Sequence, residues 1–434
     1  MAGPRRDDRG PQADGLRVPH GGAVRVPPRR RAGDGLPAPR PLRVLGRHRG
    51  RARRDPRPGK GLQGPRRPRR HRRQEDRRPR PARHHRDLHR VPAADDGRDP
   101  VVGVQVTRVA APLRWGAFVP QGWKLEYSGW AAAEAWARSV ELAQTAERVG
   151  YDHLWVYDHV ETVPRREATH CFEAFTMLAA LSQQTTTARL GQLVICSSYR
   201  NVGVLAKEAA CVDVFSGGRL ILGLGAGWYA REYEAYGFDY PSDATRLAVL
   251  EETITVIPRL WREQTVTFEG EHLRFAGAFC DPKPLQEPRP PIWVGGGGEK
   301  VTLRIAAEHA DATNWQVGLE GFVHKSEVLA EHCAALGRDF DTIVRTHGPD
   351  CRLFDTERDL EAWLDAPGGG QLWGRTPHSE YVRDNLVGTV EQVTEKVQAF
   401  VDAGCREFVL WFRDYPSSES LERFHAEVVP NVST

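Results

Sequence analysis

From Arg114 onward, short apolar runs alternate with longer segments in which apolar residues recur every three or four positions. The short runs are typical of buried parallel strands, and the longer segments are typical of amphipathic helices. Strands are predicted at 114–119, 153–157, 189–195, 219–224, 291–294, 311–315, 342–347 and 407–412. Helices are predicted at 131–149, 171–184, 202–215, 246–262, 300–309, 322–336, 390–403 and 418–428.

This alternation predicts a (β/α)₈ TIM barrel with insertions over residues 113–434. One insertion is expected at 265–275, where the residues alternate around a glycine as they do in a hairpin. Residues 365–380 are rich in Gly and Pro, which predicts a long loop or lid. A doubly wound open sheet is the alternative, but it needs fewer strands and leaves the eighth unexplained.

Residues 1–112 differ sharply from the rest of the chain in composition. Roughly 31 of the 61 Lys and Arg residues, but only about 11 of the 57 Asp and Glu residues, precede Leu113. The segment has few aromatic residues and no sustained apolar period, so it cannot bury enough apolar area to offset the entropy of ordering. We therefore predict a disordered Arg- and Pro-rich extension ahead of the barrel domain.

Two interpretations of this extension stay open. Clustered arginines attract phosphates without reading sequence, which would make the extension a nucleic-acid-binding tail with the barrel as its passenger. Alternatively, a composition rich in Arg and Pro but nearly free of Lys is typical of GC-rich upstream DNA, translated ahead of a true start near Val101, Val102 or Val109. We favour this second interpretation, under which nucleic acid is not a partner.

The seven cysteines are scattered and never spaced as Cys-x-x-Cys. This pattern argues against a zinc ribbon, a redox-active pair or a disulfide framework, and for a reducing cytoplasm. Because no His-x-His or His-Glu-x-x-His motif occurs, no metal site is expected. The sequence has no secretory signal near Met1 and no run of about twenty apolar residues, so no membrane span is expected.

The candidate chemistry stands at the C-terminal ends of the predicted strands, where barrel enzymes carry their active sites. The second strand ends at Asp158-His159, and an imidazole beside a carboxylate is a candidate to carry a proton near neutral pH. The plainer alternative is a capping Asp followed by a surface His. The third strand ends in small residues around Cys196, which either line a pocket or cap the next helix.

A glycine-rich segment follows the fourth strand. Gly225, Ala226 and Gly227 expose backbone to a flat ligand or a phosphate, since glycine places no Cβ in the way. Trp228 comes directly after them and is a candidate to face an aromatic ligand, with core packing as the alternative.

A second glycine-rich segment follows the fifth strand. Gly296, Gly297 and Gly298 lead into a predicted helix that begins at Lys300. Backbone N–H groups, the helix dipole and a lysine charge together predict a phosphate site here, with a plain flexible loop as the alternative.

Together these segments resemble the luciferase-like monooxygenase family, and within it the oxidoreductases that depend on the deazaflavin coenzyme F-420. The resemblance covers about Arg114 to Pro430. It rests on W-V-Y-D-H at 155–159, R-L-G-Q-L-V at 189–194, Y-R-N at 199–201, L-A-K at 205–207, D-V-F-S-G-G-R-L-I-L-G-L-G-A-G-W at 213–228, F-E-G-E-H-L-R-F at 268–275 and P-P-I-W-V-G-G-G-G-E-K at 290–300.

The resemblance implies a (β/α)₈ barrel, usually dimeric, with a flavin or deazaflavin at its C-terminal mouth. In this family a non-proline cis peptide bond commonly ends the third strand, which places it at Leu193-Val194. His159 matches the family histidine beside the hydride-transferring ring. The residues from Gly225 to Trp228 would flank that ring, and Gly296 to Gly298 with Lys300 would hold the cofactor phosphate.

The sequence departs from the family pattern at two positions. Some deazaflavin enzymes of the family carry a tryptophan four residues after the histidine and an acid at the position of Trp228. Here those positions hold Val163 and Trp228, so a sugar-phosphate substrate is not implied. The family's catalytic acid is not carried over to any residue of this chain, Glu232 included.

These observations lead to the hypothesis of a cytoplasmic homodimeric oxidoreductase that moves a hydride between coenzyme F-420 and a small organic substrate. Asp158 is expected to orient His159, which carries the accompanying proton. Val163, Trp123, Trp228 and residues 365–380 are expected to shape an apolar pocket. The alternative enzyme is a two-component monooxygenase that uses reduced FMN and oxygen.

Overall fold

A computed structural model describes residues 112–366 and 376–433 of the chain. The predicted disordered extension at 1–112 therefore lies outside the described residues, apart from its last position. Part of the predicted loop at 365–380 lies outside them as well. Among the helices of the described ranges, none is long and apolar enough to cross a membrane.

Eight parallel strands form a closed barrel, because the last strand pairs with the first. This confirms the predicted barrel and excludes the open sheet. The order around the barrel is β1, β2, β3, β5, β8, β9, β10 and β13. Their bounds are Arg114–Phe118, His153–Val156, Arg189–Gln192, Leu220–Gly225, Ile292–Gly295, Ala312–Trp315, Val344–His347 and Glu407–Phe412.

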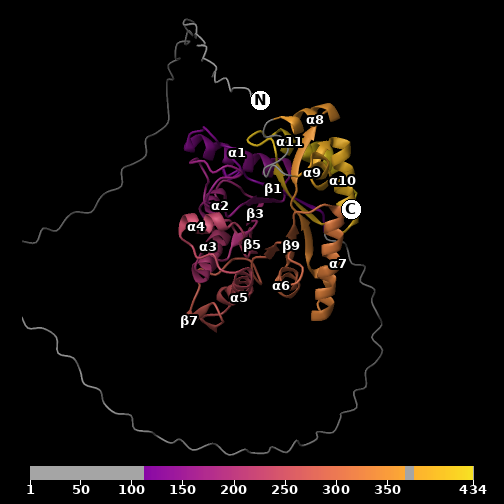
Figure 1. The fold of residues 1–434 in the computed structure, drawn as a ribbon. Helices are drawn as coiled ribbons and strands as arrows, with labels where there is room; N and C mark the ends of the chain where they lie inside the picture. The colour runs from indigo at the N-terminus through magenta and orange to yellow at the C-terminus, as the bar shows by residue number, and fades with distance from the viewer. Residues whose placement is uncertain (1–111, 367–375, 434) are drawn as a thin grey trace, which may run out of the picture. The chain divides into compact units, whose positions relative to one another are not determined.

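Helices surround these strands on the outside (Figure 1). They are α1 Ala132–Val149, α2 Ala174–Leu181, α3 Val202–Phe215, α4 Ala230–Tyr236, α5 Asp243–Arg262, α6 Thr302–His309, α7 Leu319–Leu336, α8 Glu357–Asp365, α9 His378–Asp384, α10 Val390–Asp402 and α11 Glu419–Arg423. Several helix ends are capped: Asn201 accepts hydrogen bonds from the first turn of α3, and Gly150 closes α1 in the left-handed conformation.

Large rings fill the interior of the barrel. Trp155 and Trp293 pack with their ring centroids 4.5 Å apart, and the Trp155 indole N–H donates to His153 Nδ1 at 2.6 Å. Gly116 and Gly191 face these rings, and a Cβ at either glycine would overlap them. The small residues on neighbouring strands therefore make room for the tryptophans in the core.

The structure also differs from the predicted elements. The third strand is broken into β3 and the short β4 (Ile195–Cys196), which both pair with β5. The seventh strand bends at Gly348-Pro349 and continues as β11 (Asp350–Phe354), which pairs with β13 and with the added strand β12 (Leu386–Thr389). Of the expected loop at 365–380, Asp365 ends α8 and residues 378–380 begin α9, while 367–375 lie outside the described residues.

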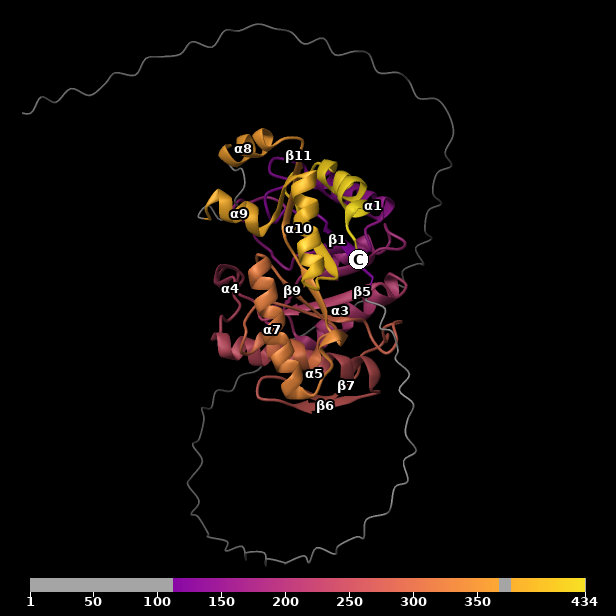
Figure 2. The same ribbon diagram turned by 90° about the vertical axis from the view of Figure 1, so that its right-hand side faces the viewer.

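The predicted hairpin is confirmed as an antiparallel pair, β6 (Val266–Glu269) and β7 (Arg274–Ala278). It lies on the opposite side of the domain from α8 in both views of the ribbon (Figure 2). The elements added around β11 and β12 are therefore separate from the hairpin insertion.

Candidate active site

A cavity of about 840 Å³ opens at the C-terminal ends of the barrel strands. It is lined by segments that follow β1, β2, β3, β5, β8, β9 and β10. Twelve of the thirteen residues predicted from the sequence line it: Asp158, His159, Leu193, Val194, Cys196, Gly225, Ala226, Gly227, Trp228, Gly296, Gly297 and Gly298. Lys300 is exposed and is not among the lining residues.

One wall of the cavity is built around Val194. The peptide bond between Leu193 and Val194 is cis, as the family resemblance predicted. The Val194 side chain occupies the space that a Cβ on Gly225 or Gly295 would need. Gly225 is thus explained by contact with a protein side chain, whereas the sequence suggested the approach of a ligand.

His159 lies flat against Trp123 beside this wall. Their ring centroids are 4.1 Å apart and their planes differ by 2°. The His159 side chain is 14% exposed, and its Nδ1 lies 2.8 Å from Glu232 Oε2. A carboxylate accepts this hydrogen bond, so Nδ1 is the donor and Nε2 is left for other contacts.

Glu232 belongs to α4 and is fully buried. Besides His159, it accepts hydrogen bonds from the backbone N–H groups of Val160 and Glu161 and from the Tyr199 hydroxyl. Burial alone would raise the pKa of Glu232, but the hydrogen bonds from His159 and the backbone hold it below its ordinary value. The group beside His159 is therefore an ionised carboxylate.

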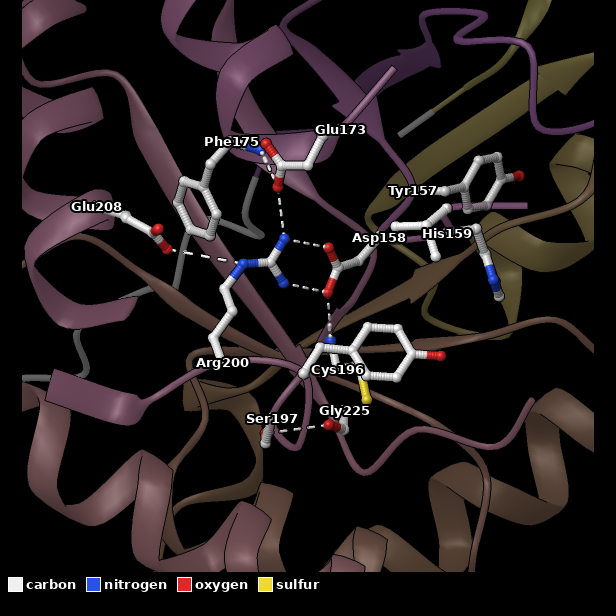
Figure 3. A network of polar contacts seen from close by, with 12 residues as sticks. Tyr157, Asp158, His159, Glu173, Phe175, Cys196, Ser197, Arg200, Glu208 and Gly225 are labelled. Atoms are coloured by element: carbon white, nitrogen blue, oxygen red, sulfur yellow. Dashed lines mark hydrogen bonds and ion pairs between the residues drawn. The ribbon is translucent and has the colours of Figure 1, made fainter. Parts of the chain in front are cut away.

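Asp158 does not orient His159, and this prediction is wrong. Its carboxylate faces Arg200, with Oδ2 2.6 Å from Nη1 and Oδ1 2.7 Å from Nη2, and it also accepts from the Cys196 N–H (Figure 3). Arg200 also forms ion pairs with Glu173 at 2.5 Å and with Glu208 at 3.7 Å. Asp158 thus anchors α2 and α3 to the second strand.

Cys196 lies between the cavity and this ionic network. Its thiol is 3.0 Å from the Tyr233 hydroxyl, and burial raises the pKa of Cys196 to about 11. A neutral thiol is a poor nucleophile, so Cys196 contributes shape to the cavity wall.

The glycine segment from Gly296 to Gly298 precedes α6 as predicted, but a different lysine approaches it. Lys325 of α7 donates to the Gly297 carbonyl at 2.8 Å and is 3.4 Å from Glu299. The distance along the chain hid this contact, since α7 packs beside α6 only in the folded barrel.

Sequence reasoning also missed a charged group on the β1 and β10 side of the cavity. Lys124, Asp350 and Tyr381 all line it, and each comes from a different part of the chain. The one signal in the sequence is that Trp123 and Lys124 follow shortly after the end of β1, where barrel loops reach the cavity. Val163, which was expected to shape the pocket, is buried and does not line it.

Comparison with known proteins agrees with this geometry. The model of the luciferase-like monooxygenase family matches residues 117–366. The F420-dependent glucose-6-phosphate dehydrogenase of Intrasporangium calvum is 33% identical over 335 residues, which is 72% of this chain and 98% of that protein. The oxygenase component of the flavin-dependent trigonelline monooxygenase of Acinetobacter baylyi is 28% identical over 328 residues, covering 68% of this chain and 89% of that protein.

Solved structures share the fold at lower identity. An F420-dependent secondary alcohol dehydrogenase in complex with an F420-acetone adduct superposes with a TM-score of 0.61 at 21% identity, over 74% of this chain and 100% of that one. The tetrahydromethanopterin reductase of Methanopyrus kandleri gives a TM-score of 0.62 at 18% identity, with the same two coverages. With the family model matching more than half of its length, this chain belongs to the luciferase-like monooxygenase family.

Proposed function

We propose that the protein is an oxidoreductase that transfers a hydride between coenzyme F-420 and a small organic substrate. The observation that carries this proposal is that His159, hydrogen-bonded to the buried Glu232, lines the same cavity as the Leu193-Val194 wall. The relatives with F420-dependent dehydrogenase activity, which this chain matches over nearly their whole length, support the choice of cofactor.

The residues of the cavity fit a flat polar ring. Val194 presents an apolar side chain where the glycines of β5 and β8 leave space, which gives one face for such a ring. Trp123, Tyr157 and Trp315 line the cavity, and within the described part of the chain the polar atoms of their side chains are buried without hydrogen-bond partners. Buried donors without protein partners are satisfied when a ligand supplies acceptors.

His159 is the group that handles the proton. When bound, the deazaflavin supplies or accepts the hydride. Glu232 accepts from Nδ1 and fixes the orientation of the imidazole, so Nε2 is the atom that donates a proton to the substrate oxygen or removes one from it. The stacking of Trp123 holds the ring in its plane and keeps water from that face.

The segment from Gly296 to Gly298 would hold the cofactor phosphate. It lines the cavity just before the first turn of α6, where backbone N–H groups and the helix dipole favour an anion. Lys325, bound to the Gly297 carbonyl, supplies the positive charge there in place of Lys300.

Titration of the full-length protein tests the cofactor. Oxidised F-420 and FMN are added separately while tryptophan fluorescence is followed. Micromolar binding of F-420 with much weaker binding of FMN is the expected result. Tight binding of FMN alone, with oxygen uptake in the presence of the reduced flavin, would place the enzyme with the flavin monooxygenases. If the folded protein binds neither F-420 nor FMN, both the proposed function and the flavin-monooxygenase alternative are contradicted.

The substrate class is small and organic, and we do not extend the sugar phosphate of the dehydrogenase relatives to this chain. Trp228 is 58% exposed at the cavity and edge-on to His159, with ring centroids 6.1 Å apart. An exposed aromatic side chain at this point offers an apolar face to a substrate.

The proposal includes a homodimer in the cytoplasm. Seven unpaired cysteines suit a reducing compartment. Val204, Phe215 and Phe279 expose large apolar side chains around a groove between α3 and the hairpin, and a second copy of this chain is the proposed occupant. Light scattering during size exclusion should give twice the chain mass, and Phe279→Asp should reduce it to one. A monomer for the unaltered protein would refute the dimer.

A further inference from the structure

Lys124 is a buried ammonium group on the cavity wall. It follows Trp123 in the loop after β1, and its side chain is only 6% exposed. Nζ lies over three aromatic rings, 4.4 Å from the centroid of Trp411, 5.4 Å from Tyr157 and 5.5 Å from Trp123. Aromatic faces attract a cation but do not accept its N–H bonds as an oxygen does.

The ammonium group lacks a full set of acceptors. Within residues 112–366 and 376–433, its one ion pair is with Asp350 Oδ1 at 3.5 Å, which is long for a hydrogen bond between charged groups. Ammonium offers three N–H donors, and burial without acceptors is costly. A side chain in this situation, facing a cavity, is arranged to receive an acceptor from a ligand.

Asp350 cannot satisfy Lys124 because other groups share it. Its Oδ2 accepts from the Tyr381 hydroxyl at 2.8 Å and lies 3.6 Å from Arg413 Nη1. Two cations therefore depend on one carboxylate. Glu126 is the other nearby acid, but burial raises its pKa, so it is a weak counter-ion for Lys124.

We propose that Lys124 is the binding point for a carboxylate group of the substrate, whose flat apolar part lies against Trp123 and Tyr157 beside His159. The inference rests on the proposed function for the identity of the occupant as substrate. It adds a specificity-determining residue: the carboxylate is held at Lys124, and the reacting carbon and its oxygen are presented to His159.

The electrostatics of Lys124 agree with this arrangement. Burial lowers the pKa of Lys124 to about 8, although Asp350 counteracts part of that shift. A ligand carboxylate would supply the missing acceptor and stabilise the charged form, which a neutral ligand of the same shape cannot do.

Matched probes test the proposal. Benzoate and benzamide have nearly the same shape, and they are titrated into the full-length protein by calorimetry. Benzoate should bind roughly 10- to 100-fold more tightly, the range expected for a hydrogen bond to a charged group. Equal binding of the two probes, or no benzoate binding at all, would overturn the proposal.

Variants separate Lys124 from the rest of the cavity. Lys124→Met should bring the ratio of the two dissociation constants close to one, and Lys124→Arg should restore part of the preference because it keeps the charge. Arg262→Gln, which removes an exposed cation outside the cavity, should leave the ratio unchanged. A preference for benzoate that survives Lys124→Met would refute the role of Lys124.

Cofactor titration of the same samples keeps the two proposals apart. Binding of F-420 without a benzoate preference would overturn the role of Lys124 and leave the proposed function standing. A benzoate preference that depends on Lys124, in protein that binds neither F-420 nor FMN, would overturn the proposed function and leave Lys124 as a carboxylate-binding residue.

Discussion

Two histidines of this domain lie flat against aromatic rings, and their surroundings differ. His159 stacks on Trp123 at 4.1 Å, and His347 stacks on Phe400 at 4.0 Å. His159 lines the cavity and bonds to a buried carboxylate. His347 belongs to β10 and is fully buried, and its Nδ1 is 3.1 Å from the Trp315 carbonyl oxygen.

The partner of each imidazole, and not the ring beneath it, sets the proton chemistry. Burial lowers the pKa of His347 to about 4, and the Trp315 carbonyl and the charge of Asp384 offset only part of that shift, so this side chain is neutral in the folded protein. His159 instead donates from Nδ1 to the Glu232 carboxylate, which fixes the orientation of an imidazole that lines the cavity. Both histidines are stacked, but only His159 combines a carboxylate partner with access to the cavity, which is why we propose it and not His347 as the proton carrier.

The largest expected effect follows from removing that carboxylate charge. Glu232→Gln should lower the rate of hydride transfer with F-420 by a factor on the order of 10² to 10⁴, the usual contribution of a general acid or base. Single-turnover oxidation of reduced F-420 measures it, while equilibrium titration of the cofactor should change little. Because the two residues act as a unit, adding His159→Asn should cause little further loss. Additive losses would contradict the pairing.

The second prediction concerns His347 and the stability of the fold. Its folded pKa of about 4 lies below the ordinary value of 6.5, so the unfolded chain binds a proton that the folded chain does not. Stability should therefore fall as the pH drops from 6.5 to 4, by about 3 kcal/mol from this group. Urea unfolding across that range measures it. His347→Asn should flatten the dependence, and an unchanged slope would refute the assignment.

The third prediction asks whether Asp158, which adjoins His159 in sequence, shares in its chemistry. Asp158→Asn breaks the contact with Arg200, which keeps Glu173 as a partner, so we expect a loss of about 2 kcal/mol in the free energy of unfolding. The pH dependence of hydride transfer should keep its shape. A shifted pH profile would show that Asp158 acts on His159 after all.

The smallest expected effect is at residues 296–298, the proposed phosphate segment. A Cβ on Gly297 would meet the flexible end of Lys325, so the fold should tolerate Gly297→Val. The dissociation constant of F-420 should rise about tenfold, which is about 1.4 kcal/mol. The rate at saturating cofactor should stay the same, as fluorescence titration and single-turnover kinetics can check. A lowered rate would place this segment in the chemistry itself.

The fold was predictable because the barrel strands are buried on both faces. Runs such as 220–224 and 408–412 are continuous and apolar, and they leave little ambiguity. The strands beyond β10 were missed, since β11 and β12 are short and follow a bend at Gly348-Pro349. The residues around Gly348-Pro349 look the same in the sequence whether the strand ends there or bends and continues.

The sequence predicted which backbone segments line the candidate site, but it did not predict which side chains bond to one another there. Strand ends and glycines identified the cavity, but the partner of His159 lies 73 residues away on α4. Asp158 was chosen because it adjoins His159. In extended backbone, successive side chains point in opposite directions, so neighbours in sequence are poor candidates for a hydrogen-bonded pair. Asp158 lies against Arg200 (Figure 3), whereas the His159 imidazole lies against Glu232.

The packing of Val194 against the two glycines ties three positions together in any variation of this protein. A library that varies position 225 alone should return glycine almost exclusively, because every other side chain meets a Val194 methyl group. In a Val194→Ala background the nearest remaining atoms are the Cβ of residue 194 at 3.5 Å and the Gly295 carbonyl oxygen at 3.7 Å, so alanine at 225 becomes acceptable. Redesign of the cavity must therefore vary positions 194, 225 and 295 together, because a side chain at 225 or 295 needs a smaller one at 194.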